Sequence, residues 1–235
     1  MNKGKIRKIL IIVGIIVVLW ALESAGYFLV AIQSGLAHGG PSAAVNLQLP
    51  IDRIIPWWTP IFALYIPLPY IWIIWFPIIA LLMNGKKGFA QYSIISLIMY
   101  IAGILIYWLM PTVTIPHDFV DGTIQTLPSN SMFFQTISDL DSSPLNVFGS
   151  FPSYHNFWAG LCVLFGIIGL VNAKNRTHKL AVQIGGILFI IYGLAISVST
   201  LVLHQHAILD FVFTYIMVAI FYFVMSKFKW DEKLT

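Results

Sequence analysis

Two histidines and a carboxylate lie close together in segment 199 to 210, Ser-Thr-Leu-Val-Leu-His-Gln-His-Ala-Ile-Leu-Asp, where one apolar run ends and another begins. His206 and Asp210 are four residues apart, so on a helix they share one face with Cβ atoms roughly 5–6 Å apart. A carboxylate at that distance can orient an imidazole and increase its basicity. The pair therefore has the composition of an activated nucleophile, although such a spacing is more often a local hydrogen bond.

A second polar group precedes another apolar run. Residues 151 to 156 read Phe-Pro-Ser-Tyr-His-Asn. Serine and asparagine can cap a helix, and the N-terminus of a helix presents free N–H groups and a partial positive charge. An anion such as a phosphate can bind there. Taken alone, Pro-Ser-x-His is equally compatible with a simple capped helix start.

The elements that position these residues are expected to be membrane helices. The chain is 59% hydrophobic and 9% charged, whereas soluble domains have about 25% charged residues. Crossing a hydrocarbon core of about 30 Å takes roughly 20 helical residues. Six apolar runs are long enough, near residues 8 to 33, 59 to 83, 90 to 110, 152 to 172, 180 to 203 and 207 to 226. We expect an all-α, polytopic six-transmembrane-helix bundle, with residues 1 to 235 forming a single membrane domain.

The basic residues predict the orientation of this bundle. Twelve of the thirteen fall on one side of the six-span arrangement, and only Arg53 falls on the other. The twelve are Lys3, Lys5, Arg7, Lys8, Lys86, Lys87, Lys174, Arg176, Lys179, Lys227, Lys229 and Lys233. By the positive-inside rule both termini are cytoplasmic. This distribution explains the net charge of +4 without a nucleic acid or another acidic partner.

Two single residues bear on the interior of the bundle. Glu23 lies inside the first run, where an unpaired charge costs about 2.5–3.5 kcal/mol at the helix centre. We expect a structural pairing for it. Cys162 is the only cysteine, so neither an intramolecular disulfide nor a four-cysteine metal site can form.

The expected topology brings Ser153, His155, His204, His206 and Asp210 to the outer membrane boundary. Two imidazoles, a hydroxyl and a carboxylate suit displacement at phosphorus. One imidazole attacks and forms a phosphohistidine, and the other protonates the leaving oxygen and then activates water or an alcohol. This route needs no metal or other cofactor. A zinc site formed by the three histidines is the weaker alternative, because no ligand spacing of the His-x-x-x-His or Cys-x-x-Cys kind supports it.

The two motifs resemble a known family. Phe-Pro-Ser-Tyr-His at 151 to 155 is similar to the second signature of the type-2 phosphatidic acid phosphatase superfamily, and Ser-Thr-x5-His-x3-Asp at 199 to 210 is similar to its third. The residues of these two motifs most resemble those of the branch that contains inositol phosphorylceramide synthases, sphingomyelin synthases and related bacterial enzymes. Ile-Asp-Arg-Ile-Ile-Pro at 51 to 56 and Pro-Thr at 111 to 112 also resemble that branch. The likeness covers about residues 50 to 220, so the first helix at 8 to 33 precedes it.

The resemblance implies roles for five residues. It implies that His206 is the nucleophile, that Asp210 is its orienting carboxylate and that His155 is the general acid and base. Ser153 would be a phosphate ligand, and Ser199, the serine of the third signature, is a further candidate for binding the phosphate. A six-helix fold, an extracytoplasmic site and no metal requirement are implied as well.

The chain departs from the family pattern in its cations. The family's first signature supplies a lysine and an arginine to the phosphate, yet no Lys or Arg occurs between residues 88 and 173. The arginine expected in the third signature is replaced by Thr200. Three substitutes are available, Arg53, His204 and His117. We hypothesise that His204 and Arg53 take over part of the phosphate binding that the missing lysine and arginine would provide.

These observations predict a metal-independent lipid phosphatase or phosphotransferase that hydrolyses a lipid phosphomonoester or diphosphate at the outer face. Phosphatidic acid, phosphatidylglycerol phosphate and isoprenyl diphosphates are candidate substrates. The alternatives are transfer of a phospho-headgroup to an alcohol acceptor, and a catalytically impaired family member that binds or moves lipid. The expected partners are the phosphorylated lipid and the bilayer. Frequent use of Ile, Lys and Asn favours a bacterial plasma membrane.

Overall fold

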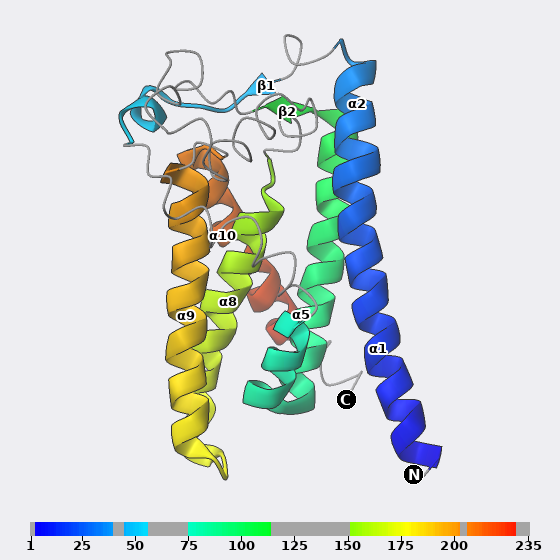
Figure 1. The fold of residues 1–235 in the computed structure, drawn as a ribbon, viewed down its shortest axis with the longest axis vertical. Coiled ribbons are helices and arrows are strands. Elements are labelled where there is room, and N and C mark those ends of the chain that lie inside the picture. Colours follow the sequence, from blue (N-terminus) through cyan, green and yellow to red (C-terminus); the bar gives the residue numbers. More distant parts are fainter. Residues whose placement is uncertain (1–2, 40–44, 56–74, 114–150, 203–205, 229–235) are drawn as a thin grey trace, which may run out of the picture.

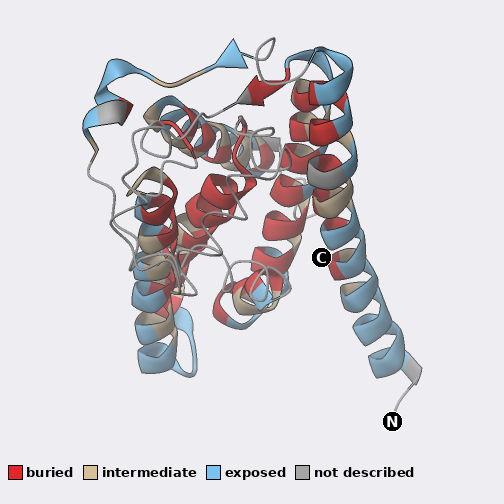
Figure 2. Ribbon diagram, turned by 45° about the horizontal axis from the view of Figure 1, so that its top comes forward, coloured by how far each residue is buried: buried red, intermediate tan, exposed pale blue. Residues whose placement is uncertain are grey.

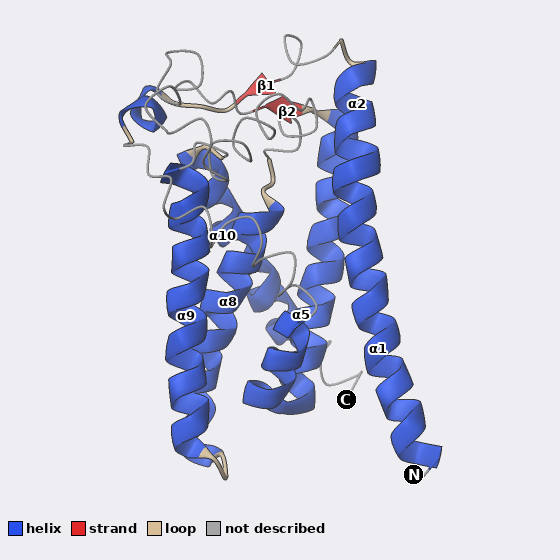
Figure 3. Ribbon diagram, in the orientation of Figure 1, coloured by secondary structure: helices blue, strands red, loops and turns tan. Residues whose placement is uncertain are grey.

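The fold is a bundle of long helices (Figures 1 and 3), and the computed structural model describes residues 3–39, 45–55, 75–113, 151–202 and 206–228. The helices are α1 (Lys3–Ser24), α2 (Ile32–Ala37), α5 (Trp75–Leu109), α8 (Tyr154–Asn172), α9 (Lys179–Val202) and α10 (Ile208–Phe228). A π-helical segment, η1 (Ala25–Ala31), joins α1 to α2 without a break. Counting that continuous stretch once, the described part holds five helices long and apolar enough to cross a membrane.

The observed helices follow the predicted apolar runs closely where the chain is described. The runs predicted at 152 to 172, 180 to 203 and 207 to 226 correspond to α8, α9 and α10, with ends that differ by at most two residues. The first run corresponds to α1, η1 and α2. The second run, 59 to 83, lies mostly outside the described residues, and only its end is seen in α5. The prediction of an all-α membrane fold is therefore confirmed at the level of five candidate spans.

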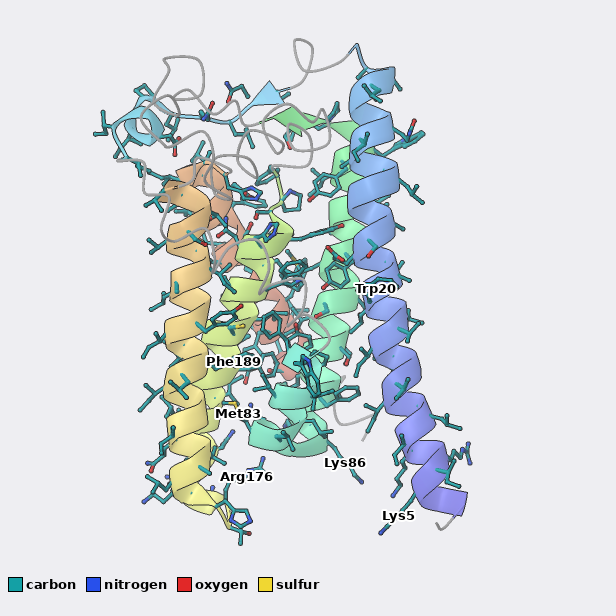
Figure 4. The ribbon with its side chains drawn as sticks, in the orientation of Figure 1. Lys5, Trp20, Met83, Lys86, Arg176 and Phe189 are labelled. Atoms are coloured by element: carbon teal, nitrogen blue, oxygen red, sulfur yellow. The ribbon has the colours of Figure 1, made fainter. Side chains whose placement is uncertain are left out.

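A turn at Gly85 divides α5. Gly85 has φ 72° and ψ −165°, a conformation that suits glycine and interrupts the helix between the second and third predicted runs. An added Cβ atom there would lie 3.3 Å from a guanidinium nitrogen of Arg176. Lys86 and Arg176 therefore lie at the same end of the bundle, where Figure 4 also shows Lys5.

The core is centred on α8 (Figure 2), whose residues Phe157, Trp158, Leu161 and Phe165 are fully buried. Glycines allow α9 to approach α8 closely. An added Cβ at Gly193 would lie only 2.6 Å from the carbonyl oxygen of Ala159. Small residues of this kind at helix contacts are typical of membrane bundles, where close packing replaces the hydrophobic effect as the source of association.

The outer surfaces of the peripheral helices are apolar. Exposed hydrophobic side chains on α9 and α10 include Leu188, Ile191, Ile216 and Phe223. Glu23 is buried within α1 and accepts a hydrogen bond of 3.3 Å from the neighbouring Ser24 hydroxyl. An apolar exterior around a core that contains the polar groups is the arrangement that a lipid environment requires.

Short segments connect the helices at the end opposite Lys86 (Figure 1). Strands β1 (Val45–Asn46) and β2 (Thr112–Val113) form a parallel pair. The Thr112 hydroxyl oxygen accepts a hydrogen bond of 2.9 Å from the Phe151 N–H, and the Tyr107 hydroxyl donates to the Pro152 carbonyl at 2.6 Å. The end of α5 thus fixes the chain entering α8, where the candidate site begins.

Candidate active site

The predicted His206 and Asp210 pair is present, but it spans a helix start instead of lying within one helix. Helix α10 begins at Ile208, so Asp210 is in its first turn and His206 precedes it. His206 Nδ1 lies 2.9 Å from Asp210 Oδ2, and both side chains are buried. The backbone N–H of His206 donates to the carbonyl of Thr200 at 3.2 Å, which anchors the histidine to the end of α9. A carboxylate in a first turn is also favoured by the helix dipole.

The Asp210 carboxylate is held by three groups. Besides contacting His206 through Oδ2, it accepts through Oδ1 a hydrogen bond of 2.8 Å from the backbone N–H of Ser153 and one of 3.2 Å from the Thr214 hydroxyl. A buried carboxylate requires such partners, because its charge is costly to desolvate otherwise. The arrangement fixes the position of Asp210, and through it the orientation of the His206 ring.

Ser153 connects the two motifs that lie more than fifty residues apart in the sequence. It is the N-cap of α8, with its side-chain oxygen accepting from the Asn156 N–H at 3.1 Å. The same oxygen lies 3.0 Å from His206 Nε2. A carboxylate oxygen 2.9 Å from Nδ1 favours the tautomer protonated there, and in that tautomer Nε2 accepts a hydrogen bond from the Ser153 hydroxyl. Nε2 is then the ring nitrogen that carries the lone pair.

His155 forms the second half of the site. It lies in the first turn of α8 and is buried, as is His206. The centroids of the two imidazole rings are 5.8 Å apart. Behind His155 is Trp158, with ring centroids 5.1 Å apart in an edge-on contact, and the Trp158 indole N–H donates to the Tyr100 hydroxyl at 3.0 Å. This aromatic backing restricts the position of the His155 ring.

Asn156 is a site residue that the sequence reasoning assigned only as a possible helix cap. Its side chain is fully buried, and its Oδ1 accepts a hydrogen bond of 3.2 Å from the Thr200 hydroxyl. Its Nδ2 has no hydrogen-bond partner among the described residues. The hydroxyl of Thr200, which stands where the resemblance leads one to expect an arginine, also lies 2.8 Å from the Ser197 carbonyl, and its single proton is shared between these two acceptors. Thr200 therefore joins α9 to the start of α8.

Asp52 is a second contributor that sequence reasoning missed. Its Oδ1 accepts from the Ile208 backbone N–H at 2.7 Å, and its Oδ2 accepts from the Leu49 N–H at 2.6 Å. Asp52 thereby ties the 3-10 helix η2 (Pro50–Ile54) to the first residue of α10. In the sequence Asp52 belongs to the Ile-Asp-Arg-Ile-Ile-Pro segment at 51 to 56 that resembles the family branch, and it lies with Arg53 between the first two apolar runs, but neither observation assigned it a role.

Four predicted phosphate-binding residues are not placed against the histidines. His117 and His204 lie outside the described residues, and of Arg53 only the backbone, in η2, is described. Asp52 nevertheless brings that backbone next to the start of α10. The Ser199 hydroxyl donates to the Ile196 carbonyl within α9 at 2.6 Å, and no contact between it and the histidines is recorded in the described part of the chain. The zinc alternative depends on His204 and is therefore not tested.

No family of known proteins, no curated protein sequence and no solved structure matches the chain. The resemblance of the two histidine motifs to a family therefore stays a prediction. What the molecule can do follows from the geometry of Ser153, His155, His206 and Asp210 and from the helices that hold them.

Proposed function

We propose that the chain is a membrane-embedded lipid phosphatase that cleaves a lipid phosphomonoester or diphosphate through a phosphohistidine at His206. The observation that carries this proposal is the buried line of three groups, Asp210, His206 and Ser153. The carboxylate oxygen lies 2.9 Å from Nδ1, and the serine oxygen lies 3.0 Å from Nε2. A carboxylate, an imidazole oriented by it and a hydroxyl on the reactive nitrogen form a nucleophile with its orienting group.

In the first step His206 Nε2 attacks phosphorus. A P–N bond forms while the bond from phosphorus to the leaving oxygen of the lipid breaks. Asp210 stabilises the positive charge that develops on the imidazole, as a buried and fixed carboxylate does without reorganisation. His155, whose ring centroid is 5.8 Å from that of His206, gives a proton to the leaving oxygen.

In the second step a water molecule attacks the phosphohistidine. His155, now neutral, accepts the proton of that water while the P–N bond breaks and inorganic phosphate leaves. If the lipid is a phosphodiester, His206 displaces the lipid alcohol and holds the phospho-headgroup, and an alcohol that takes the place of water then receives that phospho-headgroup as the P–N bond breaks, which makes the site a transferase. The resemblance to headgroup-transferring synthases supports that second outcome, so the acceptor determines whether hydrolysis or transfer occurs.

The start of α8 is the proposed phosphate cradle. The Ser153 hydroxyl can turn from Nε2 to a phosphate oxygen, and the partner-free Nδ2 of Asn156 offers a second donor. The helix N-terminus adds a partial positive charge. Arg53 and His204 are the proposed cationic members, since charge-assisted contacts to phosphate are the strong ones. His117 and Ser199 are the remaining candidates for the cradle.

We infer a six-span topology with both termini in the cytoplasm and the active site facing outside, in a bacterial plasma membrane. The support is that the basic residues and the candidate active site lie at opposite ends of the bundle. Lys5, Lys86 and Arg176 lie at one end (Figure 4), and the start of α8 lies at the other (Figure 1). The positive-inside rule places the lysine-bearing end in the cytoplasm.

Phosphate release from a panel of lipids tests the function. Purified protein is incubated with phosphatidic acid, phosphatidylglycerol phosphate or an isoprenyl diphosphate, and we expect release from at least one of them. His206→Ala should abolish it, whereas His178→Ala, an exposed histidine in the turn before α9, should not. Equal activity in the His206 variant would overturn the mechanism. Absence of both release and transfer to an added alcohol would favour a non-catalytic lipid-binding protein.

A further inference from the structure

Two adjoining cavities between α1 and α5 lie away from the proposed active site. Their volumes are about 390 Å³ and 400 Å³. Ile11, Ile15, Ser93 and Ile94 line both of them, so the two form one continuous space, here called the α1–α5 groove. The groove extends from Lys8 along α1 to Leu19, which at 1.5 Å per residue is roughly 16 Å. Its walls are mostly aliphatic, and its length suits one acyl chain.

The groove has a cationic end. Lys8 from α1 and Lys86 from the Gly85 turn both line the first cavity. Both side chains are exposed, and no ion pair of either is recorded in the described part of the chain. No Asp or Glu lines either cavity. Figure 4 shows Lys86 at the lower end of the bundle, opposite the start of α8.

We propose that the α1–α5 groove binds an anionic phospholipid, with the headgroup phosphate between Lys8 and Lys86 and one acyl chain along Ile15 and Leu97. Two cations beside an apolar channel match a molecule whose phosphate and hydrocarbon chain are joined end to end. Lysines next to an acidic headgroup each strengthen its binding substantially. A zwitterionic lipid would fill the same channel, but it brings no net negative charge to the two lysines.

Other occupants fit the charge of this groove less well. Residues 56 to 74 contain no Asp or Glu. The C-terminal residues 229 to 235 contain Asp231 and Glu232, but Lys229 and Lys233 balance them. The groove lies at the end of the bundle opposite the proposed active site, so its lipid is a bound component of the protein and not the substrate. It would also stabilise the packing of α1. Apart from η1, which continues α1 along the chain, the main partner of α1 among the described elements is α5.

Native mass spectrometry of the full chain tests this site with phosphatidylglycerol and phosphatidylcholine of identical acyl chains. We expect wild type to retain phosphatidylglycerol preferentially, and Lys8→Gln/Lys86→Gln to reduce that retention roughly tenfold. The matched control is Lys174→Gln/Lys179→Gln, which removes two exposed charges beside the other turn at the same end but none from the groove. The control should keep the preference.

A second variant tests the acyl-chain channel itself. Gly14 lines the groove, and an added Cβ there meets no atom within 4 Å, so position 14 has room for a side chain, and Gly14→Phe introduces a bulky ring at the channel wall. It should lower retention of phosphatidylglycerol with both lysines intact. The proposal is overturned if wild type shows no preference, if both lysine pairs have equal effects, or if Gly14→Phe leaves retention unchanged. Retention that appears only after removal of residues 229 to 235 would assign the groove to that tail and would also overturn it.

Discussion

At the scale of single residues, Ser153 has the largest number of roles in the site. Its backbone N–H donates to Asp210 Oδ1, its oxygen caps α8, and its hydroxyl faces His206 Nε2. The backbone of this residue positions the carboxylate, and its side chain contacts the nitrogen that attacks phosphorus in the proposed mechanism. The two contributions can be separated by mutation, because alanine keeps the N–H and removes the hydroxyl.

Ser153→Ala should therefore raise KM for the phosphorylated lipid and lower kcat. It should also reduce stability by about 1 kcal/mol through loss of the helix cap. Ser197→Ala is the matched control, since Ser197 is also a buried serine but its hydroxyl lies 2.8 Å from the Tyr215 hydroxyl. Steady-state phosphate release and thermal unfolding measure both effects. If Ser197→Ala proved as damaging to kinetics as Ser153→Ala, the loss would not be specific to the phosphate cradle and the role of Ser153 would be contradicted.

Asp210→Asn should abolish most activity with little change in structure. The amide can still accept from Ser153 and Thr214, but its N–H₂ facing His206 Nδ1 forces the proton onto Nε2 and removes the nucleophilic lone pair. In a comparable histidine–carboxylate pair this change of tautomer costs on the order of 10⁴-fold in kcat. Phosphate release by the folded variant checks it, with Thr214→Val as the control that removes only a supporting donor. A loss smaller than about tenfold would show that the carboxylate does not set the tautomer.

At the scale of elements, the helices were predictable from sequence and their connections were not. Apolar run length placed α8, α9 and α10 because a membrane helix has few alternatives for its backbone hydrogen bonds. The His206–Asp210 contact was predicted from spacing, and the apolar run predicted at 207 to 226 already places His206 just before the helix that carries Asp210. The contacts of Asp52 with Ile208 and of Thr200 with Asn156 join segments 156 and 44 residues apart. Such contacts depend on helix packing and leave no periodic signal in the sequence.

Asp52 gives a prediction at this scale, because it holds η2 against the start of α10. Asp52→Ala should lower the free energy of unfolding by about 1–2 kcal/mol, as the loss of a helix cap does. It should also raise KM if Arg53 binds the phosphate. Asp52→Asn keeps one acceptor oxygen for the two N–H donors of Leu49 and Ile208, so its stability should lie between those of the alanine and wild-type proteins. Thermal denaturation in detergent compares the three proteins, and equal stability of the alanine and wild-type proteins would contradict the capping role.

At the scale of the whole molecule, the basic turns and the candidate active site lie at opposite ends of the bundle. The turns that carry Lys86 and Arg176 lie at one end, and the site around Ser153 lies at the other. Between them, close contacts such as that of Gly193 with the Ala159 carbonyl fix α9 on α8 and so fix the two motifs relative to each other. His117, one of the proposed substitutes for the missing cations, lies outside the described residues.

Cysteine labelling tests the proposed orientation. The only natural cysteine, Cys162, is buried and is replaced by alanine to give a silent background. Ile54→Cys, at a position that is 78% exposed near the site end, should react in intact cells with a maleimide that cannot cross the membrane. Lys174→Cys at the opposite end should react only after the cells are permeabilised. The reverse pattern would invert the topology and place the site in the cytoplasm.

The most direct test of the account is detection of the covalent intermediate on His206. The protein is mixed with a lipid substrate carrying a labelled phosphate, quenched during turnover and digested for mass spectrometry. We predict an acid-labile, alkali-stable phosphoryl group on the imidazole of His206, absent from His206→Ala and unchanged in His178→Ala. Phosphate release without any label on His206, or with the label on another residue, would contradict the central claim.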